Sequence, residues 1–503
     1  MTSTMDVLIV GAGPTGLMLA GDLAAAGVSC AVLERRDQES NLTRAFAVHA
    51  RTLEQLDARG VADDLVRTGA RVSSVRFFGT AQIHLSVLPS RFPYVLVTPQ
   101  YETERVLEER ARALGAEIRL GAEAVGLRQD PDGVDVDVRG RDGTAHTLRA
   151  AYVVGADGVR STVRQALGLP FPGRSVVRSV MLADVRLAEA PPDVLNANAN
   201  AVGDAFAFLV PFGDGWYRVI AWNRWYQPPD VVPVDLEEIR DVTRRALGTD
   251  YGMHDPRWMS RFHSDERQVP RYRVGRVFLA GDAAHVHSPA GGLGMNTSIQ
   301  DAANLGWKLA ATLNGQAPDG LLDTYHAERH PVGRQVLRVS GALLRGILMD
   351  GRALRTARSV VIRAATRIRP VTRRLAGTIS GIDLAYPAPR GAHPLTGRRA
   401  PDVPLTGGRR LYETLRAGRF VLVTPGSEPA SAEVTSGWAD RVEFAALAGP
   451  SRTVVLVRPD AYVAWATGEP HPERRDAMIR HALAEWCGSP AGAPTSQPTA
   501  GRS

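Results

Sequence analysis

The chain has very little lysine and cysteine and no long apolar run, and each shortage excludes a class of protein. Lys308 is the only lysine among 503 residues, so the net charge of +7 is carried by arginine. We read the arginines as spread along the chain, with no compact basic run interleaved with aromatic residues. This pattern argues against a DNA- or RNA-binding groove, and no nucleic-acid partner is expected.

The cysteine content and the lack of apolar runs bear on location. Cys30 and Cys487 are the only cysteines, too few for a disulfide framework or a metal site, so we expect a reducing cytoplasm and no metal. No apolar run can span a bilayer, and a strand pattern begins close to Met1, which leaves no room for a signal peptide. At this length, two or three domains are expected.

The first motif lies at the start of the chain. An apolar strand pattern over Asp6–Val10 runs directly into GAGPTG (Gly11–Gly16), and a helical pattern follows over 17–26. A second strand, 30–33, then ends at Glu34. This is the βαβ pattern of dinucleotide-binding folds, in which the glycines permit a tight turn and a close approach of backbone to a pyrophosphate. Glu34 would accept hydrogen bonds from ribose hydroxyls, so the ligand carries an unphosphorylated adenosine ribose, as in FAD or NAD.

The second motif has the same logic in the middle of the chain. A buried-strand pattern over Val277–Ala280 ends at Gly281-Asp282, and the glycine-rich loop Pro289–Gly294 follows. Asn296, with the two residues after it, can cap a helix expected over Ile299–Leu313. A strand end with an acid, a glycine loop and a helix N-terminus together indicate a site for a flat, partly anionic ligand.

The third motif is another strand that ends in an acid, over 152–154 with Asp157. Ligands of open α/β sheets bind at the carboxyl ends of strands, so Asp157, Asp282 and the first glycine motif should converge on one large cofactor. Four short strands, expected at 118–120, 124–128, 134–138 and 146–150, read as an antiparallel meander. A second glycine motif for a nicotinamide nucleotide is absent from the sequence.

These three motifs resemble the FAD-dependent aromatic hydroxylases of the para-hydroxybenzoate hydroxylase superfamily, the group A flavoprotein monooxygenases. Within it, the chain is most similar to the polyketide and antibiotic hydroxylases, such as the aklavinone, anhydrotetracycline and rifampicin monooxygenases. The resemblance covers nearly the whole chain. It implies an α/β fold with a Rossmann-like FAD-binding domain, an interleaved β-sheet substrate domain and a thioredoxin-like C-terminal domain.

The resemblance also implies a set of cofactor-binding residues. It places Arg44 and Gln100 beside the flavin, Asp282 on the ribityl chain, and Met295 and Asn296 under the isoalloxazine. Ser288 and Leu293 depart from the family pattern, where proline and glutamine are frequent. The predicted set is Gly11, Gly13, Pro14, Thr15, Gly16, Glu34, Arg35, Arg44, Gln100, Val125, Asp157, Asp282, Pro289, Gly292, Gly294, Met295 and Asn296.

The expected domain division follows the same resemblance. The FAD-binding domain is expected over residues 1–175 and again over 268–386, where it includes a helical segment. The substrate domain is expected over 176–267, with a contribution from about 74–96. A thioredoxin-like domain without a CxxC motif is expected over 395–487, and residues 488–503 are expected to be disordered. Alternating aromatics in the substrate domain indicate either a pocket or one packed sheet face. The candidates for lining a pocket are Phe206, Phe208 and Trp222, with Trp225 and Tyr226.

Two other segments have alternative interpretations. His326, Glu328 and Arg329 have a charge spacing that is more typical of structure than of catalysis. The arginine-rich helical pattern from His330 to about Leu375 is compatible with a membrane-surface helix, but its apolar spacing favours helices packed on the protein, and no membrane partner is expected.

The activity implied by the resemblance is aromatic hydroxylation. NADPH, or NADH, would bind transiently and reduce FAD, O₂ would give a flavin C4a-hydroperoxide, and one oxygen atom would pass to a phenolic polyketide or related natural product. No catalytic side chain is identified, and Arg44 is the only candidate. Baeyer–Villiger oxygenation and antibiotic-inactivating monooxygenation use the same flavin chemistry. A non-catalytic flavin-binding partner in a biosynthetic complex is the alternative of another class. A monomer or a homodimer is expected.

Overall fold

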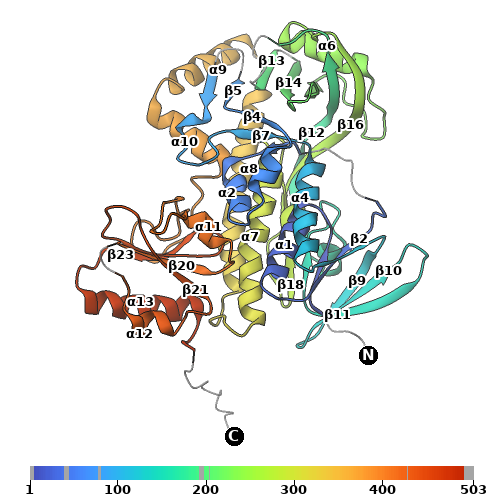
Figure 1. The fold of residues 1–503 in the computed structure, drawn as a ribbon. Helices are drawn as coiled ribbons and strands as arrows, with labels where there is room; N and C mark the ends of the chain where they lie inside the picture. Colours follow the sequence, from blue (N-terminus) through green and yellow to red (C-terminus); the bar gives the residue numbers. More distant parts are fainter. Residues whose placement is uncertain are drawn as a thin grey trace.

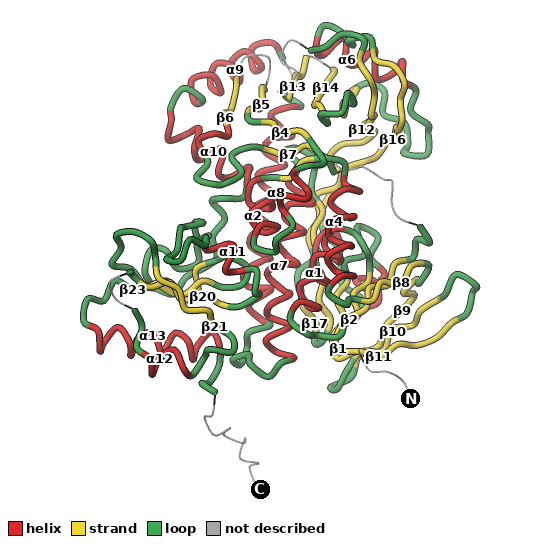
Figure 2. The backbone as a smooth tube through the Cα atoms, in the orientation of Figure 1, coloured by secondary structure: helices red, strands yellow, loops and turns green. Residues whose placement is uncertain are grey.

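The computed structural model describes residues 5–38, 45–77, 81–191, 197–202, 204–349, 351–426 and 429–491. Three bodies are visible in the ribbon: a central nucleotide-binding body, a sheet-rich body above it, and a smaller α/β body beside the long helix α7 (Figures 1 and 2). This is the α/β class with the three parts expected from the sequence.

The central body is built on a sheet with strand order β17-β18-β11-β1-β2-β8, extended by β9 and β10. β1 pairs in parallel with both β2 and β11, and β18 pairs in parallel with β11. Four consecutive residues of β1 are buried, as in parallel strands that are covered on both faces. The strands are β1 (Met5–Val10), β2 (Cys30–Glu34), β8 (Glu117–Leu120), β9 (Glu123–Gln129), β10 (Val134–Arg139), β11 (Ala145–Gly155), β17 (Arg273–Val274) and β18 (Val277–Leu279).

The predicted four-stranded meander is wrong in two respects. β8 pairs in parallel with β2 and so belongs to the nucleotide-binding sheet. β11 is one long strand that pairs antiparallel with β10 through its first half and parallel with β1 through its second half. The strands lie close to their predicted positions, but a pattern of alternation does not reveal which neighbour a strand pairs with.

Helices cover the central sheet and connect it to the other bodies. α1 contacts both α4 and α7, and α7 contacts α2 and α8. Leu17, Leu19 and Leu23 of α1 are buried in the same apolar core as β1 and β2. The helices here are α1 (Pro14–Ala25), α2 (Ala50–Asp57), α3 (Ala62–Val66), α4 (Gln100–Ala113), α5 (Thr162–Ala166), α7 (Leu293–Leu313) and α8 (Asp323–Ile347), and the 3₁₀ turn η2 (Gly281–Ala283) follows β18.

The upper body is a sheet of order β19-β16-β12-β15-β14-β13-β5-β6, with α6 packed on β13, β14 and β15. The strands β5 and β6 come from the first third of the chain and join this sheet through β13, as the predicted interleaving requires. Its elements are β5 (Ser74–Phe77), β6 (Ala81–His84), β12 (Gly173–Leu187), β13 (Ala197–Val202), β14 (Ala205–Pro211), β15 (Tyr217–Asn223), α6 (Leu236–Leu247), β16 (Met253–Gln268) and β19 (His285–Val286).

A three-stranded sheet and two further helices complete this part of the molecule. The sheet has the order β3-β7-β4, and η1 (Leu85–Val87) follows β6. The helices α9 and α10 follow α8 and contact β6 at the edge of the sheet of the upper body. Their bounds are β3 (Ala47–Val48), β4 (Ala70–Val72), β7 (Val95–Val97), α9 (Arg352–Ala365) and α10 (Arg369–Ser380).

The C-terminal body has a four-stranded sheet of order β21-β20-β22-β23. Its core includes Trp307 and Leu321, so it packs directly on the end of α7 and the loop that follows. Residues 488–491, expected in the disordered tail, hydrogen-bond to this body through Trp438 Nε1 and the Gly437 carbonyl; residues 492–503 lie outside the described residues. The elements are α11 (Leu411–Leu415), β20 (Phe420–Thr424), α12 (Ala432–Ser436), β21 (Val442–Ala446), β22 (Val454–Val457), β23 (Val463–Thr467) and α13 (Pro472–Cys487).

Candidate active site

The turn between β1 and α1 is shaped by glycines at its two tightest points. A Cβ on Gly11, which has φ +106°, would lie 2.4 Å from the Ala156 carbonyl oxygen, and one on Gly16 would lie 2.0 Å from the Gly11 carbonyl oxygen. Gly13 differs, because its missing Cβ faces open space at the N-terminus of α1. Pro14 occupies the first helical turn. The turn therefore presents an open helix N-terminus, which attracts anions such as a pyrophosphate.

Glu34 closes this turn from the end of β2. Its carboxylate is buried and accepts hydrogen bonds from the Ala12 backbone N–H (2.9 Å) and from Arg36 Nε (2.9 Å). Burial alone would raise the pKa of Glu34, but the hydrogen bonds and the charge of Arg36 outweigh it and lower the pKa. Glu34 is therefore an anion next to the glycine turn. Arg35 is exposed, and it is Arg36, which the sequence did not single out, that holds the carboxylate.

The turn after β11 carries Asp157, and the turn after β18 carries Asp282. The two turns lie side by side because β11 and β18 are neighbours, with Gly155 opposite Leu279. Arg164 joins the turns, since its guanidinium donates to the carbonyls of Val159 and Ala283. Asp157 Oδ2 accepts from the Val163 backbone N–H, and burial raises the pKa of Asp157. The predicted convergence of the strand ends is confirmed.

The glycine loop and the start of α7 differ from the sequence prediction. α7 begins at Leu293, six residues before the predicted start, and its N-cap is Gly292 with φ +64°. Asn296 is inside the first turns and does not cap the helix; its Nδ2 donates to the carbonyls of Gly292 and Ala47, and its Oδ1 accepts from the His49 backbone N–H. His49 Nε2 lies 2.9 Å from the Gly291 carbonyl oxygen. Asn296 and His49 thus fix the loop to the segment before α2.

Gln100 extends this network to α4. Its Oε1 accepts a hydrogen bond from the Ala45 backbone N–H, and its Nε2 donates one to Glu104. Burial raises the pKa of Glu104 to about 7. Arg44, the one candidate for a catalytic side chain, lies outside the described residues. Val125 is on β9 and is exposed.

The fit of this region to a large flavin nucleotide can be tested on its polar atoms. Several of the buried side-chain atoms without a hydrogen-bond partner lie at these turns and at the glycine loop, which is expected where a ligand supplies the partners. A Cβ on Gly281 would lie 2.7 Å from Thr15 Oγ1 and 3.0 Å from Ser298 Oγ, so the turn after β18, the first glycine turn and α7 meet at one place. The residues present fit FAD. The unpartnered atoms in this region include Asp157 Oδ1, Ser298 Oγ, Ser288 Oγ, His49 Nδ1 and His287 Nε2.

An apolar cavity of about 170 Å³ lies against the glycine loop. Pro289, Ala290, Gly291 and Gly292 form one wall, and His49 is the only titratable residue among those that line it. Burial lowers the pKa of His49 to about 4, so the wall is uncharged at neutral pH. The remaining lining residues are Phe46, Ala47, Val72, Val75, Ile83, Leu85, Val95, Val97, Val177, Val180, Ala199, Phe206, Phe208, Val210, Ile220, Trp222, Leu343, Leu344, Ile347, Leu348 and Ile379.

The predicted aromatic residues divide into two groups. Phe206, Phe208 and Trp222 line the cavity, and the Phe208 ring lies 5.9 Å from that of Phe46. Trp225 and Tyr226 do not line the cavity and are 77% and 52% exposed. The prediction that these two residues line the pocket is therefore wrong. They follow the end of β15, beyond the sheet whose alternation brings Phe206 and Phe208 to the cavity.

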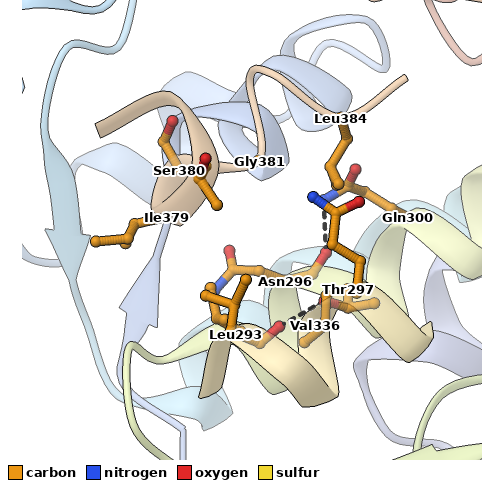
Figure 3. Close-up of a pocket in the computed structure, with 12 residues that line it drawn as sticks. Leu293, Asn296, Thr297, Gln300, Val336, Ile379, Ser380, Gly381 and Leu384 are labelled. Carbon is orange, nitrogen blue, oxygen red and sulfur yellow. Dashed lines mark hydrogen bonds between the residues drawn. The ribbon is translucent and has the colours of Figure 1, made fainter. Parts of the chain in front are cut away.

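A second cavity, of about 20 Å³, lies behind the start of α7 (Figure 3). Asn296, Thr297 and Gln300 line it from α7, and Ile379, Ser380 and Gly381 line it from the end of α10. Gln300 Nε2 donates to the Asn296 carbonyl, and Thr297 Oγ1 donates to the Leu293 carbonyl. The space suits a water molecule and is too small for an aromatic ligand. The apolar cavity is therefore the candidate substrate site.

Comparison with known families agrees with this geometry. Residues 4–340 match the family described as FAD binding domain, and residues 393–490 match the family described as aromatic-ring hydroxylase, C-terminal. The chain belongs to the FAD-dependent aromatic-ring hydroxylases. Its cofactor is FAD, and it is an FAD-dependent monooxygenase.

A monooxygenase, a hydroxylase and a synthase are each similar to this chain over nearly their full lengths. Rifampicin monooxygenase of Streptomyces venezuelae is 43% identical, over 93% of this chain and 96% of its own. The solved structure of an anhydrotetracycline hydroxylase from Streptomyces rimosus is 41% identical, with a TM-score of 0.86 over 97% of this chain and 100% of that chain. A dialkyldecalin synthase of Streptomyces rugosporus is 35% identical, over 91% of this chain and 95% of its own. The family name alone therefore does not fix the reaction of a member.

Two findings concern other classes of site. Within the described residues, no helix is both long enough and apolar enough to cross a membrane. The same residues contain no group of three or more histidine, cysteine, aspartate or glutamate side chains placed to hold a metal ion.

Gly13→Asp is expected to separate FAD binding from folding in this hydroxylase. The N-cap backbone of Gly13 (φ −79°, ψ 179°) suits aspartate, which would also cap α1, so the apoprotein should keep its stability. The added carboxylate would occupy the space facing the helix N-terminus and repel a pyrophosphate by about 1–4 kcal/mol, a loss of affinity of at least about fivefold. FAD titration followed by flavin fluorescence measures this loss.

The matched control is Gly468→Asp, because Gly468 is exposed and its missing Cβ also faces open space. It should leave FAD affinity unchanged. Equal FAD affinity in the Gly13→Asp variant and the wild-type protein would contradict the assignment of the first glycine turn to the pyrophosphate.

Proposed function

We propose that this protein is an NAD(P)H-consuming monooxygenase that hydroxylates an uncharged, polycyclic aromatic polyketide or a related phenolic natural product. The observation that carries the proposal is the apolar cavity whose wall is the Pro289–Gly292 loop. Only His49, with a pKa of about 4, is titratable there, so a substrate carboxylate would find no cationic partner. The rifampicin and anhydrotetracycline relatives, by their names, also act on large natural products.

The proposed cofactor contacts come from four turns. Gly11, Gly13 and Gly16, with Pro14 and Thr15, would take the pyrophosphate, and Glu34 the adenosine ribose. Asp282 would take the ribityl chain and Asp157 would lie beside it. Arg35, Arg44, Gln100 and Val125 would lie beside the cofactor, and Met295 would lie under its isoalloxazine ring. When bound, FAD supplies the redox chemistry, taking electrons from a reduced nicotinamide and activating O₂ for transfer of one oxygen atom.

The protein's own contribution is orientation, charge stabilisation and exclusion of water. The N-terminus of α7 begins at Leu293, directly after Gly292, and its backbone N–H groups would stabilise negative charge at the N1–C2=O edge of the flavin ring. Asn296 and His49 hold the loop at that position. The apolar wall excludes water from the place where the substrate ring would lie.

The finer assignments rest on the family. We propose NADPH in preference to NADH as the transient reductant, a cytoplasmic location where that nucleotide is supplied, and a monomer or homodimer. The domain division at 1–175, 176–267, 268–386 and 395–487 also stays a proposal. Both cysteines are buried thiols, which suits a reducing compartment.

The test begins with the visible spectrum of the purified protein and continues with NADPH oxidation in air. Flavin bands are expected, and oxidation should accelerate with an uncharged polycyclic phenol but not with its carboxylated analogue. Mass spectrometry should show the substrate plus one oxygen atom. NMR then distinguishes a new ring hydroxyl from the ring-expanded lactone of a Baeyer–Villiger reaction.

Two results would count against the proposal. Preference for the carboxylated analogue would contradict the uncharged substrate class. A protein that holds FAD yet shows no acceleration with any phenol would favour the other class of function, in which flavin has a supporting role in a biosynthetic complex.

A further inference from the structure

Arginines are spread along the chain, as read from the sequence, but one segment has a local excess of positive charge. Residues 351–382 contain eight arginines and no aspartate or glutamate, so this segment alone carries more positive charge than the whole chain, whose net charge is +7. The segment forms α9 and α10. Among the described ion pairs, none involves Arg363, Arg367, Arg369, Arg373 or Arg374 of this segment, whereas arginines elsewhere are paired extensively.

The helix α9 also leaves its apolar side chains in solvent. None of its described side chains is buried, and Leu354, Val360, Val361 and the nearby Ile368 are 53–65% exposed. Leu354, Ala357, Val361 and Ala364 recur at intervals of three and four residues and therefore form one stripe along the helix. The expected packing against the protein is found on the opposite side of α9, which contacts β6 and where Ile362 is half-buried, but it does not cover this stripe.

We propose that this face, defined as the exposed stripe of α9 with Arg363, Arg367, Arg373 and Arg374, docks on the surface of an anionic lipid bilayer. A strongly amphipathic helix with arginines beside an apolar stripe is the type of helix that lies in the headgroup region. Each basic residue near an anionic leaflet strengthens binding. A second copy of this chain does not fit, because it would set one unpaired arginine cluster against another.

The position of the face also favours a bilayer over an acidic protein. The end of α8, with Leu343, Leu344, Ile347 and Leu348, lines the apolar cavity, and so does Ile379 of α10. The helix between α8 and α10 in the chain is α9, which lies at the outer edge of the upper body (Figure 1). An uncharged aromatic ligand partitions into bilayers, so docking here would bring the cavity to where its ligand is concentrated. This last argument rests on the proposed function, whereas the exposure and charge of the face do not.

The experiment is flotation of the full-length, FAD-loaded protein with vesicles, and it requires no turnover. One vesicle is phosphatidylcholine alone, and the other contains roughly one third phosphatidylglycerol. Binding is expected only to the anionic vesicle, and it should weaken when salt shortens the Debye length from about 10 Å to about 3 Å. No binding to the anionic vesicle at low salt would overturn the proposal, whatever the outcome of the turnover assay.

Two variants test the face itself. Replacing Arg363, Arg367, Arg373 and Arg374 by glutamine should weaken vesicle binding by about fivefold for each arginine. Leu354→Ser/Val361→Ser should weaken it by about tenfold, because the stripe would enter the bilayer. The matched control replaces Arg105, Arg128, Arg139 and Arg141 by glutamine, which are exposed arginines on α4 and around β10.

The control removes the same charge away from α9 and should keep nearly all of the binding. Equal weakening by the control would show attraction by net charge alone and overturn the proposal, and so would binding to polyglutamate without binding to vesicles. All variants should retain the flavin spectrum and the unfolding midpoint of the wild-type protein, since the substituted side chains are on the surface.

Discussion

Asp301→Ala is expected to lower the free energy of unfolding by about 3–5 kcal/mol and to weaken FAD binding. Asp301 is fully buried on α7, where Oδ1 accepts from Arg329 Nε (2.7 Å) and Oδ2 lies 2.7 Å from His285 Nε2. Burial alone would raise the pKa of Asp301, but Arg329 and His285 lower it. Without the carboxylate, the guanidinium of Arg329 is left in the interior without a counter-charge.

The same carboxylate connects stability to the cofactor site. Asp301 Oδ2 accepts from the Gly281 backbone N–H (3.1 Å), so it holds the turn that carries Asp282. Arg329 also donates to the Thr297 carbonyl on α7. Loss of Asp301 should therefore loosen this turn as well as destabilise the protein.

Urea unfolding of the apoprotein and FAD titration measure the two effects separately. Asp301→Leu/Arg329→Leu removes both charges and should be less destabilising than Asp301→Ala, because no unpaired charge remains. Glu109→Ala breaks an exposed ion pair with Arg105 and should cost less than about 1 kcal/mol. A double variant as unstable as the sum of its single variants would contradict the interpretation of Asp301 and Arg329 as a coupled buried pair.

The sequence predicted the parts of the site that depend on short-range patterns. The strand, glycine turn, helix and second strand over residues 5–34 lie together in sequence, and the structure reproduces them within a few residues. Asp157 and Asp282 follow strands whose carboxyl ends must share one edge in a parallel sheet, and β11 and β18 are neighbours.

The sequence did not predict the side chains that hold these turns in place. Arg329 contacts Asp301 from the next helix, and Asn296 contacts the segment before α2, almost 250 residues away. Such pairs leave no periodic signal, because only the packing of α7 against α2 and α8 brings them together. The start of α7 was missed because asparagine, threonine and serine read as caps, whereas Gly292 with a left-handed backbone begins the helix.

The helix α9 shows the same limitation for surfaces. Apolar spacing of three and four residues predicts an amphipathic helix, but it does not reveal whether the apolar stripe meets protein, solvent or another partner. The structure decides this, because the stripe of α9 is exposed.

Glu328→Ala is expected to have a comparably large effect, about 3–5 kcal/mol, through the junction between α7, α8 and the C-terminal body. Glu328 Oε2 lies 2.8 Å from Lys308 Nζ, and Oε1 lies 2.7 Å from an Arg458 nitrogen. Burial alone would raise the pKa of Glu328, but the charges of Arg458 and Lys308 hold it well below its usual range. Its contribution to stability is therefore complete at neutral pH and is lost as the pH falls below about 4.5.

Lys308→Met is the matched control, because the variant keeps the pair between Glu328 and Arg458. Burial lowers the pKa of Lys308 to about 8, which means that the folded protein already holds this ammonium at a cost. Methionine has a similar length without the charge, so the change should be neutral to within about 1 kcal/mol. The only lysine of the chain is then expected to matter less for stability than its carboxylate partner.

The pH dependence provides a readout that a simple packing defect would not give. In Glu328→Ala the pKa of Lys308 should fall further, because its counter-charge is gone and burial is unchanged. The unfolded chain then binds one more proton than the folded protein above that lowered pKa, so the stability of the variant rises with pH there. The deficit relative to the wild-type protein should be largest at about pH 5–6 and shrink toward pH 8. Chemical unfolding at each pH measures the deficit, and Glu328→Ala/Lys308→Met should lose this pH dependence. A deficit that is the same at all these pH values would contradict an uncompensated Lys308 charge as its cause.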